Sequence, residues 1–72
     1  METLYFVIGA FVAFADKAKA AKVAAGGRQI WAAECRSGEA EVGLLEMEDG
    51  AGGTVFYPCA PRAGVVTYRI IR

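Results

Sequence analysis

Only one stretch of this chain combines a helix start, a helix interior and a helix stop, the segment Ala15–Gly27. Asp16 can accept hydrogen bonds from the first free backbone N–H groups, and its charge is favourable at the positive end of the helix dipole. Residues 17–25 are Lys, Ala and one Val, most of them strong helix formers. Gly26 and Gly27 then favour the left-handed conformation that ends a helix. Every other segment has the composition of a strand or a turn, so we expect one short helix on one sheet.

The predicted helix has a flat apolar face. Ala20, Val23 and Ala24 fall on one side when about 3.6 residues are placed in each turn, and Lys19 and Lys22 lie opposite them. Such small side chains let a helix lie close to a sheet, but they bury little area. Large side chains of the sheet must therefore fill the core.

Runs of β-branched, aromatic and alternating apolar residues predict five strands. These strands are Leu4–Phe14, Arg28–Arg36, Glu39–Glu48, Thr54–Tyr57 and Val65–Arg72. We therefore expect the fold class α+β, with residues 1–72 forming a single small domain. The expected order is β-α-β-β-β-β, in which one short helix packs on a four- to five-stranded, mostly antiparallel sheet.

The first of these strands, Leu4–Phe14, is apolar on both faces, as is typical of a central strand that is covered on both sides. Gly9 in its middle indicates a bulge or a close approach of the helix. One helix cannot cover both faces of such a sheet. We expect the second cover to come from strong sheet curvature, from self-association as in a homodimer, or from a partner.

Two local features concern the third predicted strand. Ser37-Gly38 has the composition of a two-residue turn, which predicts a hairpin between the second and third strands. The alternation then changes parity at Leu44-Leu45, so that Leu45 and Met47 share a face with Glu41. A β-bulge is the simplest explanation of such a change.

The uncharged run Leu4–Ala15 raises the question of a membrane segment or a leader peptide. Its twelve residues are fewer than the about 20 that a membrane-spanning helix needs. Ala13-Phe14-Ala15 resembles a leader cleavage site, but Met1-Glu2-Thr3 is acidic where a signal peptide is basic. We interpret the run as a buried strand and expect a cytoplasmic protein without membrane contact.

Catalytic and metal-binding residues are scarce. The chain has no histidine, which removes the commonest general base and the Ser-His and Cys-His pairs of hydrolases. Cys35 and Cys59 do not form a C-x-x-C pair, and a zinc site would need carboxylates as well. A disulfide between them remains open, although two free, packed thiols are favoured. We expect no enzymatic activity, no metal and no cofactor.

Trp31 follows the helix and begins the next strand. In layout alone this β-α-β-β arrangement resembles the dodecins, which are small flavin-binding oligomers. No glutamine on the following strand matches the residue that would hold the flavin edge. We predict instead that Trp31 lies in the core between helix and sheet. A homo-oligomeric small-ligand-binding or structural protein is the alternative function.

The formal net charge is zero, but the charges are segregated. Residues 1–36 have a net charge of +2, residues 37–53 of −5 and residues 54–72 of +3. The carboxylates of the middle segment have no basic residue among them, so they need water or a basic partner nearby. The predicted partner-binding residues are Glu39, Glu41, Glu46, Glu48 and Asp49.

This charge layout favours a protein partner. The pI of about 6.2 argues against direct nucleic-acid binding, for which a strongly basic domain is expected. We expect a small non-enzymatic protein-interaction module, an inhibitor or regulator that binds a basic surface of a larger protein or ribonucleoprotein complex. That surface would be one that normally holds nucleic acid. In size, layout and charge the chain is similar to phage-encoded inhibitors such as anti-CRISPR and other anti-defence proteins.

Overall fold

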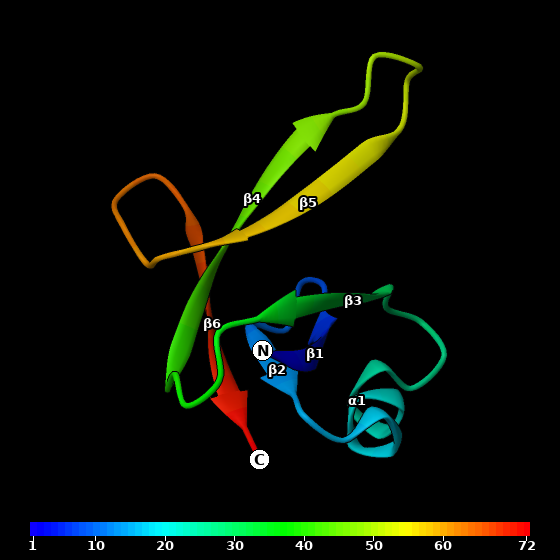
Figure 1. Cartoon of the computed structure of the whole chain (residues 1–72). Helices are drawn as coiled ribbons and strands as arrows, with labels where there is room; N and C mark the ends of the chain where they lie inside the picture. The colour runs from blue at the N-terminus through cyan, green and yellow to red at the C-terminus, as the bar shows by residue number, and fades with distance from the viewer.

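The computed structural model describes all residues from 1 to 72 and contains six strands and one helix (Figure 1). The elements are β1 (Glu2–Val7), β2 (Val12–Phe14), α1 (Lys17–Ala24), β3 (Ile30–Cys35), β4 (Glu41–Glu48), β5 (Thr54–Cys59) and β6 (Val66–Ile71). All six strands belong to one sheet with the order β3-β1-β2-β6-β4-β5. The sheet is mixed, because β2 and β6 pair in parallel while the other neighbours pair antiparallel.

The predicted order β-α-β-β-β-β with four to five strands is therefore wrong, although the α+β class agrees with the structure. The error lies in Leu4–Phe14, which is two strands and not one. The chain reverses between Val7 and Val12, where Gly9 has φ 88° and Phe11 has φ 58°. Glycine adopts this left-handed region without steric cost. The run looked continuous because both strands that it forms are buried.

The helix begins as predicted. The Asp16 carboxylate accepts hydrogen bonds from the backbone N–H groups of Ala18, at 2.8 Å, and Lys19, at 3.4 Å. The helix ends on two left-handed residues, Ala25 with φ 52° and Gly26 with φ 75°. The predicted role of Gly26 is therefore confirmed, whereas Gly27 is not left-handed and Ala25 was not predicted to be. Val23 was predicted on the buried face, but it is 38% exposed, and only Ala20 and Ala24 of α1 are buried. This helix is too short and too polar to span a membrane.

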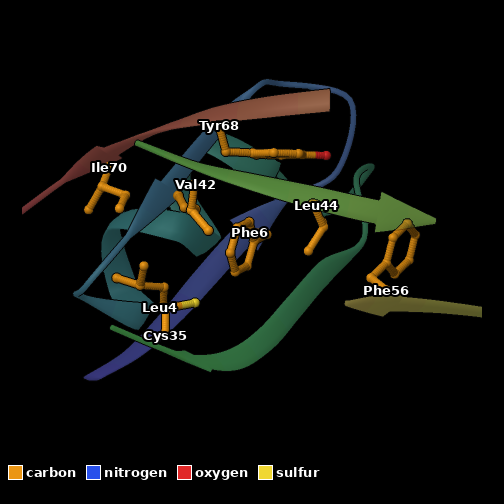
Figure 2. Packing of buried hydrophobic residues seen from close by; sticks show 9 residues of the cluster. Leu4, Phe6, Cys35, Val42, Leu44, Phe56, Tyr68 and Ile70 are labelled. Carbon is orange, nitrogen blue, oxygen red and sulfur yellow. The ribbon is translucent and has the colours of Figure 1, made fainter. Parts of the chain in front are cut away.

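Sheet curvature supplies the second cover that the two-sided apolar pattern required. One side of β1 and β2 packs against the helix through Val7, Phe14, Ala20 and Ala24. The other side faces an interior filled from β1, β2, β3, β4, β5 and β6 (Figure 2). There the rings of Phe6 and Tyr68 meet edge to face, with centroids 5.3 Å apart. The end strands β3 and β5 contact each other, so the sheet forms a nearly closed barrel.

Trp31 lies at the seam where β3 meets β5. Its ring packs edge to face on Phe56 of β5, at a centroid distance of 5.2 Å, and it contacts the barrel interior. The prediction of a Trp between helix and sheet is therefore wrong, because the alternation of β3 directs Ile30 toward the helix and Trp31 inward. The dodecin-like layout is also absent, since two strands precede the helix.

The hairpin predicted at Ser37-Gly38 is wrong as well. β3 pairs only with β1, and β4 pairs with β5 and β6. The segment between them instead carries the chain from one edge of the sheet to the other side of the barrel. Ala40 in this segment accepts a hydrogen bond from the Ile70 backbone N–H at 2.9 Å, which ties the connection to β6.

Gly43 occupies the point where β4 is paired on both sides, to Cys59 of β5 and to Thr67 of β6. A Cβ at this position would lie 2.9 Å from Val65 Cγ1 and 3.1 Å from the Ala60 carbonyl oxygen. Such contacts are too close for an unshifted side chain. The absence of a side chain thus lets the loop before β6 pack on β4.

Candidate partner-binding surface

The β4–β5 hairpin extends beyond the barrel. The last residue of β4 that pairs with β6 is Leu44, opposite Val66, whereas pairing with β5 continues from Leu45↔Tyr57 to Glu48↔Thr54. Residues 45–57 therefore form a two-stranded projection, which we call the β4–β5 arm; at its base, Phe56 is still buried in the barrel interior. Figure 1 shows it reaching away from the end of the molecule that contains α1.

The two faces of the arm differ in chemistry. Glu46 and Glu48 have the same parity as Leu44, so they continue the inner face of the barrel into solvent, while Leu45 and Met47 point the opposite way. The registers of β4 with β5 and with β6 are both regular. The predicted β-bulge is therefore wrong. The polarity reverses because inward-pointing positions lose their cover where the strand leaves the barrel.

Glu46 lies where the arm meets the barrel mouth. Burial raises the pKa of the Tyr68 phenol above its ordinary value, a hydrogen bond with the Gly9 backbone lowers it in part, and the negative charge of Glu46 raises it further. Glu46 itself is exposed and has no ion-pair partner in the structure.

Asp49 stabilises the turn at the tip of the arm through hydrogen bonds to the backbone. Its carboxylate accepts hydrogen bonds from the backbone N–H groups of Ala51, at 2.8 Å, and Gly53, at 3.0 Å. These bonds hold the pKa of Asp49 below its ordinary value of 3.8, because they favour the charged form. Asp49 therefore has a structural role in addition to its charge.

Glu39 and Glu41 lie at the barrel end of β4, away from the arm. Glu39 pairs with Arg36 at 4.0 Å between Oε1 and the guanidinium, and both side chains are largely exposed. Glu41 is opposite Arg69 of β6 in the register. The five predicted partner-binding residues thus divide into an arm group of Glu46, Glu48 and Asp49 and a barrel-end group of Glu39 and Glu41.

A cavity of about 500 Å³ lies at the same end of the barrel, between the end of β3 and the end of β5. It is lined by Glu34, Glu39 and Glu41 together with Arg36 and the two cysteines, Cys35 and Cys59, among others. Its volume falls within the range of small-molecule sites. Sequence reasoning missed Glu34, since only the crossing from β3 to β4 brings it beside the acidic segment.

The two thiols at this cavity are free; Cys35 is buried and Cys59 is half-buried. Burial raises the pKa of the Cys35 thiol above its ordinary value of 9.0, and the charge of Glu2 adds to this. A raised pKa lowers the thiolate fraction and with it the reactivity of the sulfur. No group of three or more potential metal ligands is positioned around a common point.

Comparison with known proteins finds no matching protein-family model, no matching curated protein and no matching solved structure. The chemistry of the exposed surface is therefore the basis for a functional proposal. It offers unpaired carboxylates on one face of the arm, an apolar opposite face, and a cavity with acidic side chains at its edge.

Proposed function

We propose that this protein is a small, non-enzymatic protein-interaction module that acts in the cytoplasm as an inhibitor or regulator. In this proposal it binds a basic surface of a larger protein or ribonucleoprotein complex, as phage-encoded anti-defence proteins do. The observation that carries the proposal is the projection of the β4–β5 arm, with Glu46 and Glu48 exposed on one face and free of ion pairs.

Electrostatics supports the arm group as the first point of contact. Exposed charges act over about 8 Å at physiological ionic strength, so carboxylates on a projection reach a partner before those next to compensating cations. Glu39 and Glu41 have Arg36 and Arg69 beside them, whereas the arm has no basic residue. Complementary charges of this kind mainly raise the association rate and fix orientation.

The test uses two double variants with the same change in net charge. Glu46→Lys/Glu48→Lys reverses the arm, and Glu39→Lys/Glu41→Lys reverses the barrel end. Both serve beside the wild type as baits in pull-downs from the native cells, with partners quantified by mass spectrometry. Association rates with the captured partner are then measured at low and high salt. We expect the arm variant to associate roughly tenfold more slowly, with a weakened or inverted salt dependence.

The barrel-end variant is the matched control and should retain most of the wild-type rate. Circular dichroism should be unchanged in both variants, because exposed substitutions seldom alter stability by more than about 0.5 kcal/mol. If the association rate falls equally in the two variants, the net charge of the protein speeds association and no defined acidic site is needed. An arm variant that binds as fast as the wild type would rule out the acidic arm as the contact.

The second candidate is a small-ligand-binding protein, and the cavity of about 500 Å³ is the observation that favours it. Its acidic edge, from Glu34, Glu39 and Glu41, suits a cationic ligand. A thermal-shift screen of small amines distinguishes the two functions. A ligand that stabilises the wild type but not the Glu39→Gln/Glu41→Gln variant would favour this second function.

A further inference from the structure

One edge of β4 is unpaired along the β4–β5 arm. Beyond Leu44, which pairs with Val66, no residue of β6 continues beside β4. The chain that precedes β6 instead turns onto one face of β4, where Val65 and the Ala60 carbonyl lie over Gly43. Figure 1 shows β5 as the neighbour of β4 in the arm, in agreement with the strand order. We call the side of the arm that β6 leaves open the β4 edge.

The backbone N–H and C=O groups of Glu46 and Glu48 point to the β4 edge. Along an antiparallel strand, successive residues direct these groups to opposite neighbours. The Ile70 N–H donates to the Ala40 carbonyl oxygen at 2.9 Å, so the even-numbered residues of β4 face β6. Pro58 of β5, which has no N–H to donate, lies opposite another even-numbered residue and agrees with this assignment. No other backbone hydrogen bond reaches Glu46 or Glu48 from that side.

The free edge of β5, on the other side of the arm, is protected. Pro58 removes a backbone donor from it, and proline on an edge strand opposes pairing with another chain. Trp31 of β3 also packs against Phe56 there. Along the β4 edge no proline occurs, and Glu46, Met47 and Glu48 are all exposed. The β4 edge is therefore the side of the arm that is open to a further strand.

Charge decides which strand can pair with the β4 edge. An antiparallel second copy would place Glu46 and Glu48 opposite the same two residues of the other chain, and like charges directly opposite each other are destabilising. The carboxylates thus oppose self-pairing. A strand with Lys or Arg at those positions instead places opposite charges about 5 Å apart between Cβ atoms. Its intervening side chains fall on the apolar face of Leu45 and Met47.

We propose that an extended segment of the partner adds to the β4 edge as an antiparallel strand, with Lys or Arg opposite Glu46 and Glu48 and apolar residues between them. In strand addition the main-chain hydrogen bonds give affinity and alternate side chains give specificity, so a large apolar area is not required. The proposal rests on the proposed basic partner and names how that partner is bound. Because the free edge is short, an isolated segment should bind weakly and should bind less at high salt.

The probe is a short capped peptide of alternating Lys and Val, added to the full chain while amide chemical shifts are recorded. The largest shift changes should centre on the amides of Glu46 and Glu48. Lysines opposite these residues occupy hydrogen-bonded positions, so methyl groups on the lysine backbone nitrogens remove the donors that face β4. This methylated peptide should bind roughly tenfold more weakly, as expected for the loss of one or two hydrogen bonds.

Two variants of equal charge identify the edge that is used. Glu48→Pro removes an N–H group from the β4 edge. Glu48→Gln/Thr54→Pro removes one from the β5 edge, at the other member of the same cross-strand pair. Each variant loses one carboxylate and gains one proline. The peptide should still bind the second variant, but its binding to Glu48→Pro should be lost. Circular dichroism and the amide spectrum establish that both variants are folded.

The proposal is overturned if the alternating peptide does not bind the wild type, if its methylated form binds equally well, or if the shift changes centre on another strand. Equal binding of the peptide to the two proline variants also overturns it. The proposed function fails separately. If the peptide binds at the β4 edge but Glu46→Lys/Glu48→Lys leaves the association rate of the captured partner unchanged, the acidic contact with that partner is wrong and the strand addition stands.

Discussion

At the scale of single residues, Cys35 and Cys59 differ in burial, although both line the same cavity. Cys35 is buried and its thiol has a raised pKa, first because of burial and second because of Glu2. We expect iodoacetamide to alkylate Cys59 first in the folded protein and Cys35 only slowly. Thiol titration under denaturing, non-reducing conditions should count two groups.

The same raised pKa predicts how stability depends on pH. The unfolded thiol ionises near its ordinary value of 9.0, whereas the folded thiol holds its proton to higher pH. The contribution of Cys35 to stability is therefore complete below about pH 9 and is lost as the pH rises through the folded pKa. Cys35→Ser should remove this decrease in stability at alkaline pH, while Cys59→Ser should leave the decrease unchanged. A titration that counts no thiols would mean a disulfide and would contradict both expectations.

At the scale of elements, the order of the β4–β5 arm depends on its turn. Asp49→Ala removes the acceptor of the Ala51 and Gly53 N–H bonds. We expect amide hydrogen exchange in residues 47–55 to become several-fold faster, with the barrel strands unchanged, because this part of the arm lies beyond Phe56, which is buried in the barrel interior. Gly53→Ala should act similarly, since its Cβ would lie 2.5 Å from Asp49 Oδ2.

Acid should act in the same way as the Asp49→Ala substitution. The folded pKa of Asp49 is lowered, so its contribution is present above the ordinary value of 3.8 and is lost as the pH falls through the folded value. Asp49→Asn is the control, because the amide oxygen still accepts a hydrogen bond but does not titrate. If Asp49→Ala leaves the hydrogen exchange rates of the arm unchanged, the turn does not depend on this side chain.

At the scale of the whole molecule, Trp31 and Phe56 join the two end strands of the sheet without backbone pairing between them. Trp31→Ala should destabilise the fold by about 3 kcal/mol, the lower end for truncation of a large aromatic, because Trp31 is only half-buried. Trp31→Phe preserves an aromatic contact and should cost less. Urea denaturation followed by circular dichroism measures both. An unchanged denaturation midpoint combined with lost partner binding would assign Trp31 to a binding site.

Several features of the fold were predictable because their signals are local. Asp16 caps the helix through N–H groups two and three residues ahead, and such short-range bonds depend on little outside the segment. The strand content of residues 30–35, 41–48 and 66–71 follows from alternation and β-branched side chains in the same way. Of the candidate site, the exposure of all five acidic residues was predictable, since carboxylates are rarely buried without a partner.

The pairing of strands was decided by tertiary structure alone. Nothing local distinguishes a hairpin at Ser37-Gly38 from a crossing of the barrel end. The parallel contact of β2 with β6 joins segments more than fifty residues apart. These pairings determine which residues lie inward, and they place Trp31 at the seam and not under the helix. They also separate Glu46 and Glu48 from Glu39 and Glu41, because β4 leaves β6 after Leu44.

The parity change at Leu44-Leu45 shows where the sequence by itself stops. The order of residues alone determined that the alternation of apolar and acidic side chains along β4 reverses at Leu44-Leu45. Two arrangements satisfy that pattern: a bulge that turns the later residues back to the core, or a straight strand that leaves it. Only the long-range pairing decides between them, because β6 ends its pairing with β4 at Leu44, β4 continues in regular register with β5, and Glu46 beyond this point is exposed. Local chemistry thus determined each strand's two faces, and the long-range pairing decided what each face meets.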